Sequence, residues 1–138
     1  MFNLNEEASG IIAALKNVTG IGTVDYLDAL DTDGGDGPAT FPAALLALEQ
    51  IQSRQQSTFP SSPLSWAVVV KGKSHEGDNL LGTIDLIINA LDGLEAVSTG
   101  TNFLQFSDLS FFERKPGNIA YKIVFTAQSY GRSRTRIQ

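Results

Sequence analysis

The feature that most constrains the fold is a run of β-branched and aromatic residues near the middle of the chain. Residues 64–73 contain Trp66 and, after one alanine, three consecutive valines. A run of this kind is typical of a strand buried on both faces, and it is much shorter than the roughly 20 apolar residues that cross a bilayer. We therefore expect a buried strand here and no membrane partner.

The N-terminal segment has the apolar spacing of an amphipathic helix. Asn3 is placed to cap it, and Glu6 three residues later would complete a capping box. Gly20 and Gly22 then end the pattern. The predicted buried stripe consists of Leu4, Ala8, Ile11, Leu15 and Val18.

A second helix is predicted over residues 80–91. Asp78 or Asn79 is expected to cap its N-terminus, and Gly93 stands at the position favoured for glycine after a helix. Its predicted buried face consists of Leu80, Ile84, Ile87, Ile88 and Leu91.

The end of the chain predicts a β-hairpin. Residues 103–113 are rich in Phe and Leu, a Pro-Gly turn follows, and residues 119–125 alternate apolar and polar side chains. The apolar residues of the first arm change parity, so we expect a bulge near Ser107 or Asp108 to restore a single apolar face.

Residues 42–56 are the ambiguous segment. Their Ala, Leu, Glu and Gln residues favour a helix, and propensity alone predicts one. Residues 23–30 alternate in part, as a short strand does, and residues 31–38 have the composition of a loop. The order of elements predicts an α+β fold, and 138 residues fit a single domain.

Composition excludes several kinds of chemistry. The chain has no cysteine, so thiolate nucleophiles, disulfides and Cys-based zinc sites are ruled out. Its one histidine, His75, has Glu76 and Asp78 nearby, but no nucleophile or oxyanion donor accompanies them in the sequence. The start of the chain lacks the basic residues of a signal peptide, so we expect a cytoplasmic origin.

Two further patterns resemble known sites but fail in detail. Asp31, Asp33 and Asp36 lie close together among glycines, yet an EF-hand counted from Asp31 would need glycine at position 36 and glutamate at position 42. The Gly-Lys-Ser of residues 72–74 lacks the upstream glycine and the immediate helix of a phosphate-binding loop. We therefore predict no catalytic, cofactor or metal site, and hence no enzyme.

The net charge of −5 conceals an asymmetry along the chain. Residues 1–50 carry eight acidic side chains and a single basic one, Lys16. Residues 114–138 carry six basic side chains and no acidic one. This asymmetry suits a basic contact surface or complementary faces on neighbouring subunits, while solvated charge without a partner is the alternative.

The last eight residues, 131–138, alternate arginine with small residues. In an extended chain Arg132, Arg134 and Arg136 would lie on one side, where guanidinium groups suit carboxylates or phosphates. Nucleic-acid surfaces are usually broader and interleaved with aromatic residues, so a protein partner fits better. These arginines are the candidate partner-binding residues, with a tail that contacts nothing as the alternative.

Four motifs and the order of elements carry a family resemblance. They are residues 41–48 (Phe-Pro-Ala-Ala-Leu-Leu-Ala-Leu), residues 66–71 (Trp-Ala-Val-Val-Val-Lys), a short glycine-containing loop before the helix at 80–94, and residues 119–125 (Ile-Ala-Tyr-Lys-Ile-Val-Phe). Together they resemble the Mu-like phage tail terminator (tail completion) family over nearly the whole chain. The motifs are patterns of apolar residues rather than invariant chemical groups.

The resemblance implies an architecture similar to that of the lambda tail terminator. We expect a mixed, mainly antiparallel sheet flanked by two main helices, in a single domain of residues 1–138 that ends in the basic tail 131–138. By this analogy residues 41–51 form a strand that pairs with residues 66–73, so that tertiary context overrides helix propensity.

The resemblance also implies a function. Members are structural virion proteins whose subunits form a hexameric ring that caps the tail tube and joins it to the head. The implied partners are further copies of the chain and the tail tube, sheath and neck or connector proteins, with genome DNA passing through the ring lumen. The implied location is the tail-neck junction of the virion, after assembly in the host cytoplasm.

Two other classes of function remain open from the sequence. One is another head-tail joining protein, such as a neck or head-closure subunit, and the other is a small-ligand or nucleotide-handling enzyme. A closed oligomer would favour the joining roles, whereas a monomer with a ligand-dependent melting temperature would favour the enzyme.

Overall fold

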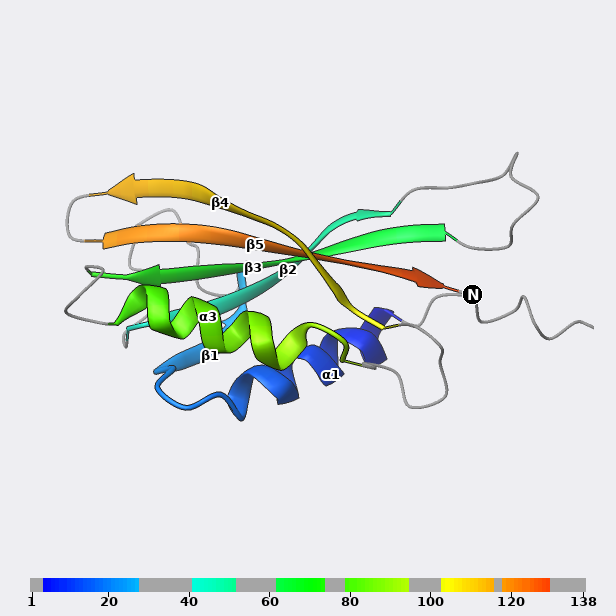
Figure 1. Cartoon of the computed structure of the whole chain (residues 1–138), viewed down its shortest axis with the longest axis horizontal. Coiled ribbons are helices and arrows are strands. Elements are labelled where there is room, and N and C mark those ends of the chain that lie inside the picture. The colour runs from blue at the N-terminus through cyan, green and yellow to red at the C-terminus, as the bar shows by residue number, and fades with distance from the viewer. Residues whose placement is uncertain are drawn as a thin grey trace, which may run out of the picture.

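The computed structural model describes residues 4–27, 41–51, 62–73, 79–94, 103–115 and 118–129. No helix within these ranges is long and apolar enough to cross a membrane. In chain order the elements are α1 (Leu4–Lys16), β1 (Thr23–Tyr26), β2 (Ala43–Ile51), β3 (Ser62–Gly72), α3 (Leu80–Leu91), β4 (Gln105–Lys115) and β5 (Asn118–Ser129) (Figure 1).

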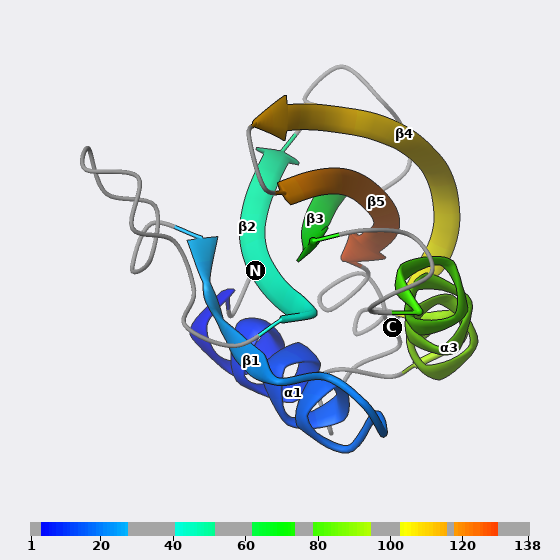
Figure 2. The ribbon, with the colours of Figure 1, turned by 90° about the vertical axis from the view of Figure 1, so that its left-hand side faces the viewer.

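The strands form one five-stranded sheet in the order β1-β2-β3-β5-β4. The pair β1 and β2 is parallel, and the other three pairs are antiparallel. Both helices lie on one side of the sheet (Figure 1), which is strongly twisted and curved when seen along its strands (Figure 2). The expected α+β fold with a mixed, mainly antiparallel sheet and two main helices is confirmed.

The valine-rich strand β3 occupies the centre of the sheet. It pairs with β2 on one side and β5 on the other, so its backbone is hydrogen-bonded along both edges. Trp66, Val68 and Val70 belong to the main core on the helix side, and the alternate residue Val69 belongs to a second small cluster. The prediction of a strand buried on both faces is confirmed.

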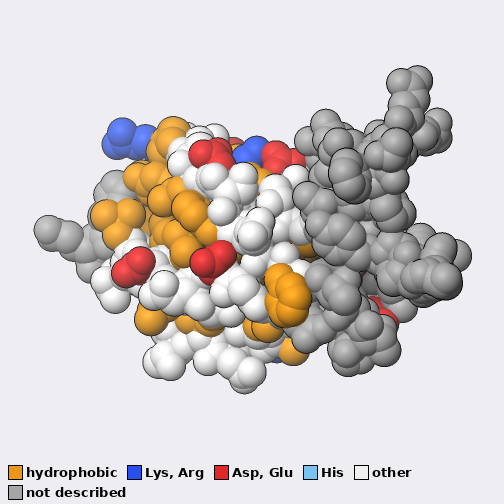
Figure 3. Space-filling model, turned by 45° about the vertical axis from the view of Figure 1, so that its right-hand side comes forward, with side chains coloured by type: hydrophobic (Ala, Val, Ile, Leu, Met, Phe, Trp, Pro, Cys, Tyr) orange, Lys and Arg blue, Asp and Glu red, His pale blue; other side chains and the backbone are white. Residues whose placement is uncertain are grey.

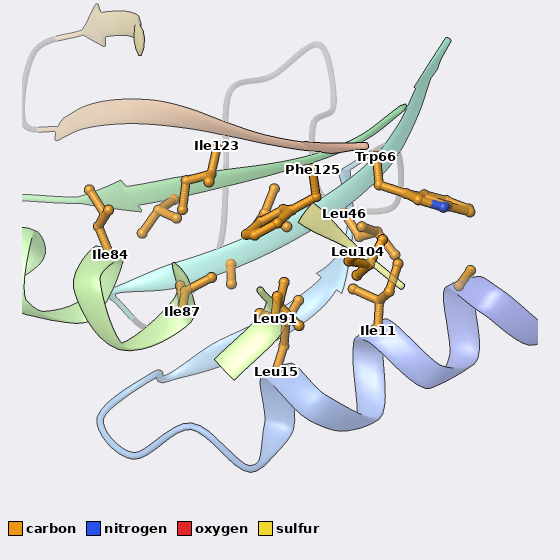
Figure 4. Close-up of a cluster of buried hydrophobic side chains, with 14 of the residues drawn as sticks. Ile11, Leu15, Leu46, Trp66, Ile84, Ile87, Leu91, Leu104, Ile123 and Phe125 are labelled. Atoms are coloured by element: carbon orange, nitrogen blue, oxygen red, sulfur yellow. The ribbon is translucent and has the colours of Figure 1, made fainter. Parts of the chain in front are cut away.

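The main core lies between the sheet and the two helices (Figure 4). Both predicted helical stripes contribute to it, because residues three and four apart share one face of a helix. Ile88 is only partly buried, in contrast to its fully buried neighbour Ile87. The buried core residues of the helices are Ala8, Ile11 and Leu15 from α1, and Leu80, Ile84, Ile87 and Leu91 from α3.

The ambiguous segment is a strand in its described part. Residues 43–51 form β2, so the helix predicted there from propensity alone is wrong, and the strand implied by the family resemblance is confirmed. Ala43, Ala44, Leu45 and Leu46 are consecutive and all buried, which a strand between two partners allows and a helix with a solvent-facing side does not. Residues 52–56 lie outside the described residues.

The hairpin of β4 and β5 contains two bulges. The register shifts between Phe106 and Asp108, which confirms the bulge predicted near Ser107. A second shift, between Phe111 and Glu113, was not predicted. Bulges bend a strand and increase its twist, in keeping with the curvature of β4 in Figure 2.

The two ends of α3 differ in how they are capped. Asn79, one of the two predicted N-cap residues, occupies the N-cap position with φ of 51°, but its side chain makes no capping hydrogen bond. Its side chain instead lies over Gly82, where an added Cβ would come within 2.6 Å of Oδ1. At the other end Gly93 has φ of 88°, which confirms its predicted role. Asp78 and the Asn3 cap of α1 lie outside the described residues.

Candidate interaction surfaces

The polar residues singled out from the sequence fall largely beyond the described part of the chain. Arg132, Arg134 and Arg136 lie outside it, and so do His75 and the loop aspartates Asp31, Asp33 and Asp36. Within the described ranges no group of three or more His, Cys, Asp or Glu side chains is placed to hold a metal ion. The structure therefore directs attention to its apolar surfaces.

The Gly-Lys-Ser motif of residues 72–74 is described only in part, because Ser74 lies outside the described residues. Gly72 is the last residue of β3, and the next helix that the structure describes begins at Leu80. Lys71 is buried, with its Nζ 3.9 Å from Oε2 of Glu113 on β4. Lys71 thus joins two strands of the sheet rather than facing a ligand.

A strip of large apolar side chains is exposed on β4. Phe106, Leu109 and Phe111, which we call the β4 strip, lie opposite Phe125, Ile123 and Tyr121 of β5. Directly opposite residues project from the same face of a sheet, so the strip belongs to the face that carries the helices. Even so, Phe106 and Leu109 are each 40% exposed and Phe111 is 54% exposed.

The path of β4 explains this exposure. The start of β4 is held against the C-terminal end of α3, because the backbone N–H of Phe106 donates to Oδ1 of Asp92 at 2.9 Å and Gly93 N–H donates to the Leu104 carbonyl at 2.7 Å. From there β4 rises away from the helix layer toward Lys115 (Figure 1). The helices consequently leave the later part of the strip uncovered.

The aromatic rings of the strip are fixed by their neighbours on β5. Phe106 packs edge-on against Phe125 with ring centroids 6.2 Å apart, and Phe111 packs edge-on against Tyr121 at 5.7 Å. Such contacts hold each ring in one orientation while leaving one side open to solvent. Burying the remaining exposed part of one such side chain would contribute about 1 kcal/mol.

Figure 3 shows the broadest area of hydrophobic side chains at the upper left of the view, with basic groups beside it and acidic groups nearby. Other exposed large apolar residues on or next to β4 and α3 are Phe103, Phe112, Leu81 and Leu86, with 53%, 41%, 54% and 47% exposure. Contiguous apolar patches of this kind usually mark interaction sites on a protein surface. Aromatic residues are also enriched at interface centres.

A pocket lies at the opposite edge of the sheet, between α1, β1 and β2. It has a volume of about 530 Å3 and a largely apolar lining that includes Leu4, Ala8, Tyr26, Leu46, Leu48 and Trp66. It forms where β1 ends at Tyr26, opposite Leu46, while β2 continues to Ile51. Tyr26 and Leu48 are 40% and 39% exposed, so they form its open rim.

The closed side of the pocket contains a buried polar pair. The indole Nε1 of Trp66 donates a hydrogen bond of 3.3 Å to Oε1 of Glu7 on α1. Glu7 is 2% exposed and Trp66 4% exposed. Figure 4 shows the Trp66 side chain projecting from the sheet on the side of α1. This contact fixes the indole ring that lines the pocket.

The elements that carry the two apolar surfaces differ in charge. The β4 strip leads at its C-terminal end to the exposed residues Arg114 and Lys115. The elements that form the pocket carry Glu6 on α1, Asp25 on β1 and Glu49 on β2. Asp25 lies opposite Leu45 and Glu49 pairs with Lys122, so these two carboxylates project from the face of the sheet away from the helices. The pocket edge of the sheet is thus acidic overall, in keeping with the asymmetry in the sequence.

Some of these charges also take part in ion pairs within the chain. Lys122 Nζ lies 2.7 Å from Oε2 of Glu49, and Lys115 Nζ lies 3.7 Å from Oε2 of Glu113. Glu49 is therefore already paired, whereas Arg114 forms no ion pair within the described residues. Exposed pairs of this kind contribute only about 0 to 1 kcal/mol, so they would exchange partners readily.

The β4 strip and the pocket were not predicted from the sequence. The density of Phe and Leu in residues 103–112 indicates an apolar face, but this composition alone does not distinguish an exposed face from a core face. The pocket had no comparable signal, because its lining residues come from α1, β1, β2 and β3 and are brought together only by the fold.

Comparison with known proteins bears on the fold. No family model matches the chain, and no curated protein matches its sequence. Twenty chains of solved structures do match. One of them, a chain from the virion of a native gene transfer agent (GTA) particle, has a TM-score of 0.61 over 91% of this chain and 92% of that chain, with 15% sequence identity. The two chains therefore share a fold nearly from end to end.

Proposed function

We propose that this chain is a structural virion protein, a tail terminator whose subunits form a ring that caps the phage tail tube and joins it to the head or neck. The observation that carries the proposal is the end-to-end fold likeness to a chain from a gene transfer agent virion. The motifs that resemble the Mu-like tail terminator family point in the same direction. Assembly, rather than catalysis, is the proposed activity.

The exposed surfaces give physical support to an assembly role. A protein that acts alone gains nothing from leaving Phe106, Leu109 and Phe111 half exposed on one face of an edge strand. Burial of these side chains against another virion protein would remove apolar surface from water and so contribute favourable free energy to binding. The proposed partners are further copies of the chain and the tail tube, sheath and neck or connector proteins, with genome DNA passing through the lumen.

The basic tail 131–138 has a proposed part in the same role. Its arginines Arg132, Arg134 and Arg136 would bind carboxylates on a neighbouring virion protein. The corresponding location is the tail-neck junction of the virion.

The test combines imaging with complementation. Electron microscopy of the purified protein should reveal closed rings, hexameric if the family resemblance holds, and the protein should complete tails in a phage lysate that lacks its own terminator. Rings that bind heads but leave tails uncapped would indicate a neck or head-closure protein. A monomer that stays monomeric beside tube protein, and whose melting temperature rises with a small ligand, would overturn the proposal.

A further inference from the structure

We propose that the β4 strip of one subunit docks into the α1-β1-β2 pocket of a second copy of this chain, giving a head-to-tail contact. This inference rests on the proposed ring and identifies the two surfaces that would form it. One surface projects large side chains, and the other is a concave site with an apolar lining. Each surface therefore offers what the other lacks.

The positions of the surfaces fit a repeating contact. The strip lies on β4 at one edge of the sheet, and the pocket lies beside β1 at the other edge. Because the two surfaces differ and occupy opposite edges, a contact between them is heterologous. Heterologous contacts leave one unused surface at each end of a dimer, so further subunits add, giving a ring where the rotation between neighbours closes and a filament where it does not.

The shape of the pocket suits an aromatic side chain. Its volume of about 530 Å3 is within the range of roughly 300 to 1,000 Å3 found for sites that bind small organic groups. The rim residue Tyr26 is 40% exposed and supplies aromatic surface against which a phenyl ring can pack, while Trp66, held by Glu7 and 4% exposed, forms part of the pocket wall. Phe111 is the most exposed member of the strip, at 54%, and is therefore the best placed to enter.

Charge complementarity favours a second copy as the occupant. Arg114 and Lys115 directly follow the strip region, and the elements that form the pocket carry Glu6, Asp25 and Glu49. Docking Phe111 into the pocket would bring the basic end of β4 toward this acidic edge of the sheet. Opposite charges around an apolar centre steer the encounter and set the register, while apolar burial supplies most of the affinity.

The test uses one acidic substitution on each surface and a matched control. Phe111→Asp alters the strip, Leu48→Asp alters the pocket rim, and Leu86→Asp places the same charge at an exposed leucine of α3 outside both surfaces. All three side chains are at least 39% exposed, so each variant should fold. Melting temperature and circular dichroism establish this before assembly is measured.

Sedimentation velocity then gives the expected results. The unmodified protein and Leu86→Asp form the same closed oligomer, whereas Phe111→Asp and Leu48→Asp each self-associate about thirtyfold more weakly or not at all. An equimolar mixture of the two defective variants forms a one-to-one dimer and stops there. Phe111→Asp retains an intact pocket and Leu48→Asp an intact strip, so one contact can form between them but the ring cannot close.

Several outcomes would overturn the inference. Normal assembly of either folded variant would do so. If Leu48→Asp assembles normally, the pocket serves another occupant, such as a small apolar ligand; if Phe111→Asp does, the strip binds another virion protein. The absence of a dimer in the mixture would exclude a strip-to-pocket contact, and a monomeric unmodified protein would remove the ring as well. Tail completion in lysate is measured in parallel, since rings that fail to complete tails contradict the proposed function and leave the strip-to-pocket contact standing.

Discussion

Trp66 on the central strand and Glu7 on the first helix form a buried hydrogen bond across 59 positions of sequence. A buried carboxylate is costly unless hydrogen bonds compensate for its lost hydration. The indole N–H supplies one such bond at 3.3 Å, and in return the carboxylate satisfies a donor that would otherwise be buried without a partner. The pair therefore ties the position of α1 to the sheet and to the wall of the pocket.

Replacing Glu7 should destabilise the protein, by an amount that depends on whether the new side chain still offers the indole N–H a hydrogen-bond acceptor. Glu7→Ala removes the acceptor and leaves the Trp66 N–H buried, so we expect a loss of about 1 to 3 kcal/mol in the free energy of unfolding. Glu7→Gln keeps an oxygen in the same place and should lose less. Urea denaturation of the three proteins measures both differences, and equal stabilities would mean that the bond contributes nothing.

Two neighbouring isoleucines of α3 should differ in their contribution to stability. Ile87 is 0% exposed in the main core, so Ile87→Ala should leave a cavity and cost about 2 to 5 kcal/mol. Ile88 is only partly buried at the edge of that core, so Ile88→Ala should cost clearly less. Thermal and urea denaturation of the pair make the comparison, and similar losses would contradict the described orientation of the helix.

The sequence alone predicts those helices and strands whose apolar residues follow a regular spacing within the element itself. The β3 strand follows from consecutive valines, and both helical stripes follow from their spacing of three and four residues. The β2 strand could not be predicted in this way, because residues such as Ala44, Leu45 and Leu46 favour a helix. What makes them a strand is pairing with β1 and β3, which residue propensities do not contain.

The surfaces depend still more on tertiary arrangement. The apolar character of Phe106, Leu109 and Phe111 is visible in the sequence, but their exposure results from the path of β4 away from α3. The pocket joins Leu4 to Trp66 across the fold. Local pattern thus reveals which side chains are apolar, whereas the packing of the helices determines which of them remain uncovered.

The acidic segment 31–38, predicted from its composition to be a loop, should not bind calcium. Its aspartates lack the glycine and glutamate positions of an EF-hand, so simultaneous alanine substitution of Asp31, Asp33 and Asp36 should leave assembly and melting temperature unchanged. His75→Ala should have equally little effect. Differential scanning fluorimetry with and without calcium provides the test; a calcium-dependent rise in melting temperature that the triple variant abolishes would establish a site.

The single tryptophan should report on subunit contact. Trp66 is the only tryptophan in the chain and lines the pocket. Trp66 is 4% exposed, so its emission maximum should hardly move, but Phe111 of a second copy would close the remaining access to the indole. Quenching of Trp66 by acrylamide should therefore fall as protein concentration rises. Phe111→Asp should show no concentration-dependent change in quenching, while Leu86→Asp should behave like the unmodified protein. A change that persists in Phe111→Asp would place some other group in the pocket.

The arginines of the basic tail should matter for joining rather than for folding. Residues 131–138 carry three arginines and no acid. Exposed ion pairs contribute only about 0 to 1 kcal/mol each, so losing them should change the melting temperature little. Several such pairs facing one acidic partner can nevertheless steer its approach and set its register. Their effect should therefore be visible only when a partner is present.

Replacing Arg132, Arg134 and Arg136 with serine tests this role directly. We expect an unchanged melting temperature and an unchanged ring size, since the strip and pocket remain intact. Completion of tails in a lysate lacking the native protein should fall. A variant that keeps one of the three arginines should lose less of this activity at low salt, because its remaining attraction to the partner is screened less at low ionic strength. Lys16→Ser, which removes a positive charge elsewhere, serves as the control. A triple variant that completes tails as well as the unmodified protein would mean that the tail arginines are solvated charge with no assembly role.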